Sequence, residues 1–298
     1  MRYLRINMTK IFCHAASPAR PLAVFALAAL LFISSAGGLL ANEPKVVADS
    51  VVLFDANSGK VLFKKNPDVQ RPVASTQKLL TALIVAESGS LSEDVTIAAA
   101  DENVEPTKLG LTPGQSYPRR QLLHALLVKS ANDVARALAR DNAGSLDAFA
   151  QRMNACMRRL GGENSNFVNP NGLPVDGQYS TARDMARVAR AAYNNSLIRE
   201  ITCIRYYPFR FANGKTTTLK NTNRVLRNYT FCNGMKTGYT ERARHCLISS
   251  GTYHGRDVIA VVLGASKAHI WDDSVNLLAY GLGIPSNKVE SFRVHGAE

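Results

Sequence analysis

Ser75 and Lys78 are the pair of residues in this chain best suited to nucleophilic catalysis. They belong to the segment Ser75-Thr-Gln-Lys78, which opens a run of apolar residues. A serine hydroxyl is a weak nucleophile unless a base takes its proton. Residues three apart on a helix share a face, and burial lowers the pKa of a lysine by disfavouring its charge. The segment therefore predicts a serine activated by a neutral amine, although alone it also fits a helix cap followed by a surface lysine.

Two later segments favour the catalytic interpretation. Ser130-Ala-Asn132 lies at a break between two predicted helices, and Lys236-Thr-Gly238 lies at the end of a predicted strand. The order S-x-x-K, S-x-N, K-T-G is typical of class A β-lactamases and penicillin-binding proteins. Each segment has the context that its role requires, namely a helix start, a helix–helix loop and a strand end. Ala131 in the middle position is the one variation.

The elements that must position these segments form a strand–helix–strand pattern along the chain. Hydrophobic periodicity predicts a hairpin over 51–63, and the helix that starts at Ser75 is apolar almost all round, which predicts a buried central helix. Further helices are predicted over 120–128, 133–140, 145–160, 181–193 and 272–280, a polar loop over 164–177, and strands over 230–236, 246–252 and 258–263. This pattern predicts one α+β domain whose sheet combines both ends of the chain.

The N-terminus reads as a secretory signal peptide. Residues 1–20 carry four bases and no acid, residues 21–33 are apolar, and small residues follow. The apolar part is shorter than the ~20 residues that a membrane-spanning helix needs. An uncleaved N-terminal anchor is the alternative. We expect a signal peptide over 1–41 and a mature protein over 42–298 that is exported to the periplasm or cell envelope.

Composition and charge narrow the function classes. Of 298 residues 46% are hydrophobic and 20% are charged, which excludes a disordered or collagen-like chain. Removing 1–41 lowers the formal net charge from +13 to +9. In an exported protein we expect a peripheral contact with an anionic cell-wall polymer or membrane surface, or a generic basic surface, rather than nucleic acid.

The cysteines and histidines show no pattern of a metal site or a triad. The cysteine spacings match no zinc motif, so buried free thiols are expected, with a disulfide as the alternative. Surface or packing roles are expected for the histidines. The residues concerned are Cys156, Cys203, Cys232 and Cys246, and His124, His245, His254 and His269.

The motifs together resemble those of the D-alanyl-D-alanine carboxypeptidases, the low-molecular-mass penicillin-binding proteins. The resemblance runs from about Ala48 to Leu282 and includes the segments 71–83, 113–117, 126–133, 167–174, 179–185 and 233–240. It implies a β-lactamase/DD-peptidase-like α+β fold, with an antiparallel sheet flanked by helices. The active site would lie between the sheet edge and a helical lobe. It also implies a serine-type hydrolase that trims peptidoglycan stem peptides ending in D-Ala-D-Ala, has β-lactams as covalent inhibitors and needs no cofactor or metal.

The catalytic roles carry over from the resemblance by position. Ser75 is the nucleophile and Lys78 its general base. Ser130 relays a proton to the leaving amine. Asn132 positions Lys78 and the substrate backbone, and Lys236 is expected to lie close enough to lower the pKa of Lys78 further.

The substrate-binding roles carry over in the same way. Lys236 and Thr237 bind the terminal carboxylate of the substrate. Gly238 lets the substrate approach the strand closely. The backbone N–H groups of Ser75 and Tyr239 form the oxyanion hole.

Departures from the family pattern keep alternative functions open. The 18 residues after Tyr280 are too few for the β-rich C-terminal domain of many relatives, so a single catalytic domain is expected over 42–298. An Arg that assists carboxylate binding in some relatives is replaced here by Ala265 or Ser266, which makes endopeptidase activity an alternative. Glu163 lacks the E-x-x-L-N context that favours β-lactam hydrolysis. A β-lactamase or esterase, or an inactive cell-wall binding protein, completes the alternatives.

Overall fold

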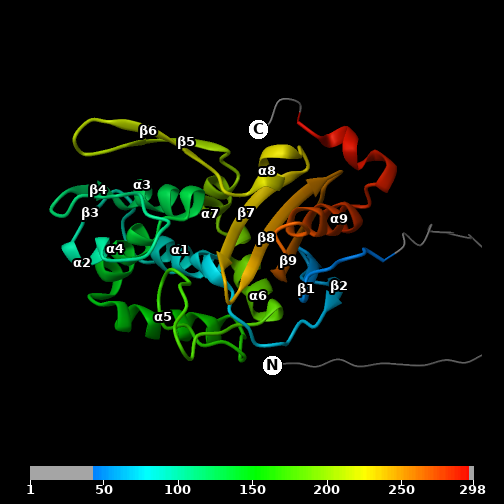
Figure 1. Cartoon of the computed structure of the whole chain (residues 1–298), viewed down its shortest axis with the longest axis horizontal. Helices are drawn as coiled ribbons and strands as arrows, with labels where there is room; N and C mark the ends of the chain where they lie inside the picture. Colours follow the sequence, from blue (N-terminus) through cyan, green and yellow to red (C-terminus); the bar gives the residue numbers. More distant parts are fainter. Residues whose placement is uncertain (1–42, 295–298) are drawn as a thin grey trace, which may run out of the picture. The chain divides into compact units, whose positions relative to one another are not determined.

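A five-stranded antiparallel sheet in the order β2-β1-β9-β8-β7 forms the centre of the protein (Figure 1). The computed structural model describes residues 43–294, so the predicted signal peptide or anchor lies outside the described residues. The strands are β1 Ser50–Asp55, β2 Val61–Lys65, β7 Cys232–Thr240, β8 Arg244–Tyr253 and β9 Arg256–Ala265. The sheet combines both ends of the chain, as predicted.

Both faces of this sheet are buried. Successive side chains of a strand point to opposite faces, so Val52 and Phe54 enter one hydrophobic core while Val51 and Leu53 enter the other. Strand β9 divides its side chains between the two cores in the same way. This explains why β1 and β9 read as uninterrupted apolar runs rather than as alternating patterns.

Helices from the middle of the chain cover one face, and the last long helix covers the other (Figure 1). The first group is α1 Lys78–Glu87, α2 Ala99–Glu102, α3 Arg119–His124, α4 Asn132–Ala143, α5 Leu146–Arg159, α6 Ala182–Asn194 and α7 Ser196–Thr202. The second core is built with α8 Arg224–Asn228 and α9 Ile270–Leu282. Every residue of α1 from Lys78 to Val85 is buried, which confirms the predicted central helix. None of the helices within 43–294 has the length and apolar character to cross a membrane.

The predicted helix starts are close to those observed. Thr181 caps α6, because its hydroxyl accepts the backbone N–H of Asp184 at 3.0 Å. Ser145 caps α5 in the same way, with Ala148 as the donor at 3.1 Å. These oxygens satisfy N–H groups that a helix start leaves without a partner.

Two sequence predictions near the motifs need correction. The helix predicted from Ser75 begins as a 3-10 turn, η1 Ala74–Gln77, and the helix predicted over 120–128 ends in a π-helical turn, η2 Ala125–Lys129. The strand predicted to end at Lys236 continues to Thr240, so the Lys-Thr-Gly segment lies inside β7. It does so because β8 pairs with this whole stretch, from Lys236 opposite Ile248 onward.

Several smaller elements carry no strong sequence signal. They are β3 Asp94–Thr96, β4 Ser116–Pro118, β5 Tyr206–Arg210, β6 Thr216–Lys220 and the 3-10 turn η3 Ser286–Phe292. The β5–β6 hairpin buries only Phe209 and Leu219 of its strands, so its polar residues read as loop. The four described cysteines are free thiols, as expected, but Cys203 is exposed rather than buried.

Candidate active site

A cleft of about 370 Å³ lies between the edge strand β7 and the helical lobe, and all three motifs meet there. The predicted site residues that line it are Ser75, Ser130, Asn132, Thr237, Gly238 and Tyr239. The two motif lysines, Lys78 and Lys236, are fully buried, each with 0% of its surface exposed. The fold therefore brings together three segments that are 55 residues or more apart in the chain.

The backbone around Ser75 is held between two glycines. Ala74, just before it, has a left-handed φ of +48°, which is uncommon for a residue with a side chain. A Cβ on Gly172 would lie 2.1 Å from the Ala74 carbonyl oxygen, and one on Gly238 would lie 2.8 Å from the Ser75 nitrogen. The close neighbour of Gly238 is thus the turn that carries Ser75. Glycine at these two positions lets a loop and a strand approach that turn from different sides.

The Lys78 amine has three oxygen neighbours at hydrogen-bond distance. Its Nζ lies 2.7 Å from Ser75 Oγ, 2.7 Å from Asn132 Oδ1 and 2.7 Å from the Asn171 carbonyl oxygen. A neutral amine has two N–H donors and one lone pair. The amide oxygen and the carbonyl can only accept, so they take both donors, and the lone pair is left for the serine hydroxyl. This geometry fits a base that removes the proton of Ser75.

Burial sets the charge state of Lys78. It lowers the pKa of the amine well below its ordinary 10.5, and the positive charge of Lys236 lowers it further. The carboxylate of Asp133 opposes the shift but does not cancel it. Both causes predicted from the sequence, burial and a second lysine, are confirmed.

Three successive carbonyl groups in the loop 169–171 are fixed by side chains at the start of α1. Gln77 Nε2, Thr81 Oγ1 and Lys78 Nζ donate in turn to the carbonyls of residues 169, 170 and 171, at 2.6, 2.7 and 2.7 Å. The sequence indicated only a polar loop here. The carbonyl of Asn171 is a functional group that sequence reasoning missed, because a backbone oxygen leaves no side-chain signal.

The second motif sits on a strained connection between η2 and α4. Ser130 has a left-handed φ of +68° and lines the cleft with only 9% of its surface exposed. Asn132 is the first residue of α4, and its Nδ2 donates to the Glu105 carbonyl at 2.9 Å. That bond orients the amide so that its oxygen faces Lys78. The predicted break in the helix is confirmed, and unusual backbone of this kind is frequent at functional sites.

On the strand side, Lys236 has few partners. Its Nζ donates to the Thr237 carbonyl at 2.9 Å, and no carboxylate within 43–294 forms an ion pair with it. Burial lowers its pKa to about 7. The hydroxyls of Thr237 and Thr222 lie 2.6 Å apart, and Thr222 also lines the cleft. Sequence reasoning missed Thr222, which precedes the short helix α8.

The rim of the cleft is aromatic. Tyr239 is 58% exposed and its ring lies 4.5 Å from that of His245, centroid to centroid. Burial and the charges of nearby basic residues lower the pKa of His245. His124 lies elsewhere, stacked on Tyr207 at 4.3 Å. His245 was not expected at the site, and its position on β8 follows from the register with Tyr239.

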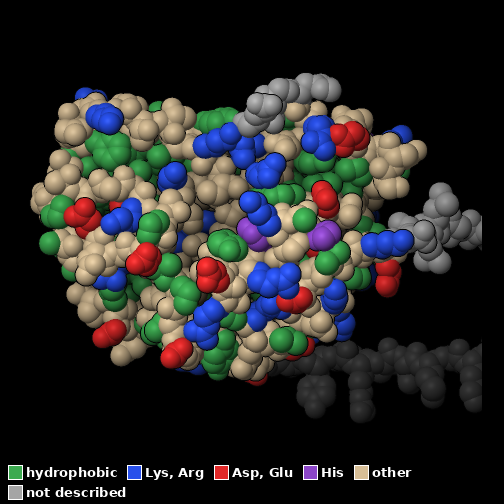
Figure 2. Space-filling view, viewed as in Figure 1, with side chains coloured by type: hydrophobic (Ala, Val, Ile, Leu, Met, Phe, Trp, Pro, Cys, Tyr) green, Lys and Arg blue, Asp and Glu red, His purple; other side chains and the backbone are tan. Residues whose placement is uncertain are grey.

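The described residues offer neither a reactive thiol nor a metal site near this cleft. Cys246 lines it, but burial raises the pKa of its thiol to about 11. Across 43–294 no three His, Cys, Asp or Glu side chains gather in a way that could hold a metal ion. The surface beyond the cleft is mixed, and Lys and Arg are prominent on the face shown in Figure 2.

Comparisons with known proteins agree with this site. The family model for peptidase S11, D-alanyl-D-alanine carboxypeptidase, matches residues 39–267. The carboxypeptidase DacF of Bacillus subtilis is 34% identical over 76% of this chain and 59% of its own length, so the chain spans about three fifths of that relative. The carboxypeptidase DacB2 of Mycobacterium tuberculosis is 34% identical over 81% of this chain and 84% of its own. A D-alanyl-D-alanine endopeptidase of Escherichia coli is 31% identical over 89% and 84%.

The fold agrees as well. The crystal structure of the Streptomyces K15 DD-transpeptidase matches with a TM-score of 0.76 and 29% identity, over 80% of this chain and 98% of that one. A D-alanyl-D-alanine carboxypeptidase structure from Mycobacterium tuberculosis matches with a TM-score of 0.77 and 31% identity, over 86% and 96%. The α+β fold expected from the motifs is confirmed, and the chain belongs to the D-alanyl-D-alanine carboxypeptidase family.

Proposed function

We propose that this protein is a serine-type D-Ala-D-Ala carboxypeptidase that trims peptidoglycan stem peptides through an acyl-enzyme on Ser75. The observation that carries the proposal is the 2.7 Å contact between Ser75 Oγ and the buried Lys78 amine, whose pKa is lowered. An exposed lysine with a pKa of ~10.4 would be well under 1% neutral at pH 7. A buried one is available as a base.

The acylation step follows from the contacts of these residues. Ser75 Oγ attacks the carbonyl carbon before the last D-Ala while its proton passes to Lys78. The carbon–nitrogen bond then breaks, and Ser130 passes a proton to the departing amine. The backbone N–H groups of Ser75 and Tyr239 stabilise the oxyanion, a contribution often worth about 3 kcal/mol per donor. Water then hydrolyses the ester and frees Ser75.

Recognition of the substrate falls to β7. A terminal carboxylate placed at Lys236 and Thr237 would supply the counter-charge that Lys236 lacks among the described residues. Binding would then raise the pKa of Lys236 and keep it charged. Thr222 extends this site, because its hydroxyl lies 2.6 Å from that of Thr237.

β-Lactams should act on this enzyme as slowly released covalent inhibitors. They mimic the D-Ala-D-Ala terminus and would acylate Ser75. Fast release needs a carboxylate that activates water, and neither Glu163 nor any other acidic residue lines the cleft. This supports a peptidase over a β-lactamase.

The cellular setting forms part of the same proposal. Residues 1–41 direct export, and residues 42–298 form one catalytic domain in the periplasm or cell envelope. The formal charge of +9 on that part supports contact with an anionic cell-wall or membrane surface. N-terminal sequencing of the envelope protein checks this, because an intact residue 1 on membrane-embedded protein would indicate an uncleaved anchor.

The decisive test is labelling with a fluorescent penicillin. The unaltered protein should be labelled and should release D-Ala from a pentapeptide, and Ser75→Ala should lose both activities. Ser58→Ala, in the exposed turn between β1 and β2, is the matched control and should behave like the unaltered protein. Labelling of Ser75→Ala at the normal rate would show that another residue is the nucleophile.

A further inference from the structure

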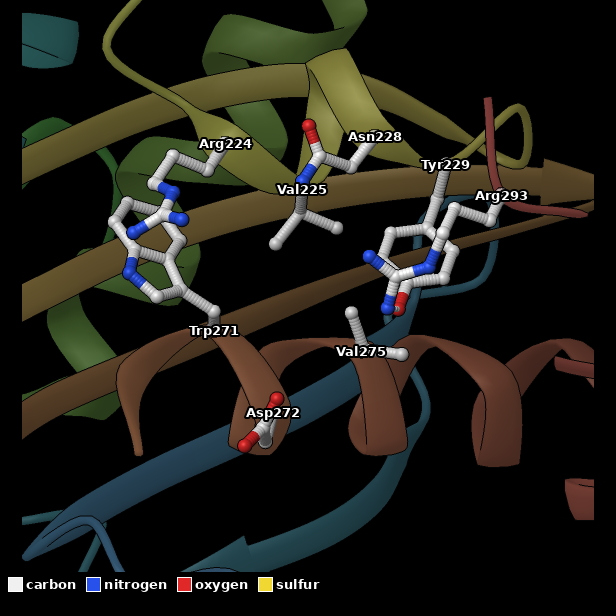
Figure 3. Close-up of a pocket in the computed structure, with 8 residues that line it drawn as sticks. All are labelled: Arg224, Val225, Asn228, Tyr229, Trp271, Asp272, Val275 and Arg293. Carbon is white, nitrogen blue, oxygen red and sulfur yellow. Dashed lines mark hydrogen bonds between the residues drawn. The ribbon is translucent and has the colours of Figure 1, made fainter. Parts of the chain in front are cut away.

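A second pocket, of about 150 Å³, lies between α8 and α9 (Figure 3). Two arginines and two aromatic rings dominate it: Arg224 lies against Trp271, and Arg293 lies against Tyr229. The guanidinium carbons are 5.5 and 5.2 Å from the respective ring centroids. Asp272 is the acidic residue in the lining, so the pocket keeps an excess of positive charge.

The two arginines differ in what they already bind. Arg293 forms an ion pair with Glu290 and donates to the Tyr229 hydroxyl at 3.0 Å. Arg224 is exposed, and within 43–294 its side chain makes neither an ion pair nor a hydrogen bond. Stacking on Trp271 fixes the plane of its guanidinium and leaves the N–H edges open. A planar guanidinium with free edges is suited to binding a carboxylate.

This pocket adjoins the catalytic cleft on a defined side. Trp271 lines both cavities. Thr222, whose hydroxyl lies 2.6 Å from that of Thr237, precedes Arg224 by two residues. Under the proposed function, Thr237 receives the carboxylate of the leaving group. The Arg224 pocket therefore lies beyond the leaving-group end of the cleft, not beyond its acyl end.

We propose that the Arg224 pocket binds a carboxylate on the leaving half of a cross-linked stem-peptide dimer, which makes such dimers a preferred substrate. The inference rests on the proposed function. When a single terminal D-Ala leaves, its carboxylate is already held at Lys236 and Thr237. When a cross-link is cleaved, the leaving amine belongs to a second stem peptide, which continues past Thr237 and carries further carboxylates.

The chemistry at Ser75 is the same for both substrates. The bond between Ser75 Oγ and the acyl carbon forms as the carbon–nitrogen bond breaks, and the second stem peptide leaves as a free amine after receiving a proton. Water then hydrolyses the ester. Only the leaving half distinguishes a monomer from a dimer, so a residue that contacts this half alone alters the preference between them.

A single carboxylate suits this pocket better than a polyanion does. The volume is small, and Asp272 faces the same space as Arg224 (Figure 3). A phosphate-rich polymer would bring several charges against that carboxylate. A peptide carboxylate brings one, and its chain can follow the continuous path from the cleft past Trp271.

The experiment compares two substrates for the purified protein: a disaccharide pentapeptide monomer and a D-Ala cross-linked dimer, with products followed by mass spectrometry. In Arg224→Gln we expect kcat/KM for the dimer to fall about tenfold, mainly through KM, as for the loss of one charge-assisted contact. Monomer cleavage and penicillin acylation should change less than twofold. Arg224→Lys should recover part of the loss, and Arg158→Gln, an exposed arginine on α5, is the control.

Other results would overturn the inference without touching the proposed function. Equal losses on both substrates would mean that Arg224 acts on the cleft itself. Unchanged dimer cleavage would mean that the pocket serves another anion, such as a phosphate polymer. Monomer cleavage by the unaltered protein with no dimer cleavage would exclude the preference. Cleavage of neither substrate would overturn the proposed function, and the inference with it.

Discussion

The two walls of the catalytic cleft hold their buried lysines in different ways. On the helical wall, Lys78 has three oxygen neighbours at 2.7 Å, two of which can only accept. On the strand wall, Lys236 has one printed acceptor, the Thr237 carbonyl at 2.9 Å. The first amine is oriented before any substrate arrives, with its lone pair on Ser75. The second lacks a counter-charge, which a substrate carboxylate would provide.

This difference shows how one protein can use the same side chain for two tasks. Burial lowers the pKa of both lysines, and the charge of Lys236 adds to the effect on Lys78. A lysine whose pKa is lowered on folding binds fewer protons in the folded state than in the unfolded state. Stability is therefore lost as the pH falls from about 10, the unfolded value, toward the folded value. The site costs the fold stability at neutral pH, which is a common feature of functional residues.

Exchanging each lysine for arginine should give the largest contrast between the walls. Guanidinium stays charged and cannot accept a proton, so Lys78→Arg should lower the rate of penicillin acylation by about 10³-fold, within the usual contribution of a general base. Lys236→Arg keeps the charge and should lose about tenfold. The second-order acylation rate measures both.

Equal losses in the two variants would show that the walls do not differ in role. Unchanged acylation in Lys78→Arg would assign the proton acceptor to another group, with Ser130 the first to test. Circular dichroism of each variant separates a chemical loss from a folding defect.

The pH profile should divide the two lysines at a smaller scale. Acylation should rise with pH while Lys78 loses its proton, and fall above about pH 7 as Lys236 loses its charge. Each outer limb should approach about tenfold per pH unit. The measurement is the acylation rate from pH 5 to 10. The falling limb should disappear in Lys236→Arg.

A β-lactam ester without a carboxylate provides the control for this profile. It gives Lys236 nothing to bind, so its rate should be low and should lack the falling limb. If the ester kept that limb, the group responsible would act on the chemistry and not on carboxylate recognition. The two lysines are coupled, so the limbs belong to the pair until the variants assign them.

The side chains of the site could be read from the sequence, but the backbone around them could not. Ser75, Lys78 and Asn132 meet as their spacing predicted, because a helix fixes neighbours three apart and short motifs mark the walls. The Asn171 carbonyl and the pairing of Thr222 with Thr237 depend on tertiary contacts with no side-chain pattern.

The fold follows the same division. Runs with strong periodicity, such as β1, β9 and α6, were found with small errors at their ends. The strand β7 was cut short at Lys236 because a lysine, a threonine and a glycine read as a strand end. The partner strand β8, which keeps this stretch extended, is fixed only in three dimensions.

The contact between the two walls should itself be testable at Gly238. A Cβ there would lie 2.8 Å from the Ser75 nitrogen and 3.0 Å from the Thr76 nitrogen, so Gly238→Ala must push β7 away from η1. We expect a loss of stability of about 1–3 kcal/mol from overpacking. Acylation should fall as well, by about tenfold, since misplacing a nucleophile is costly.

Gly251→Ala on β8 is the matched comparison. Its Cβ would lie 2.9 Å from the Phe231 carbonyl, on the α9 side of the sheet. A similar loss of stability is expected there, measured by thermal unfolding, but acylation should stay within about twofold because no cleft residue moves. If both variants lost stability and acylation in parallel, the activity loss would report general loosening of the sheet. If Gly238→Ala alone lost acylation, the fit between strand and nucleophile turn would be a property of the site, and the two walls would depend on each other through a glycine.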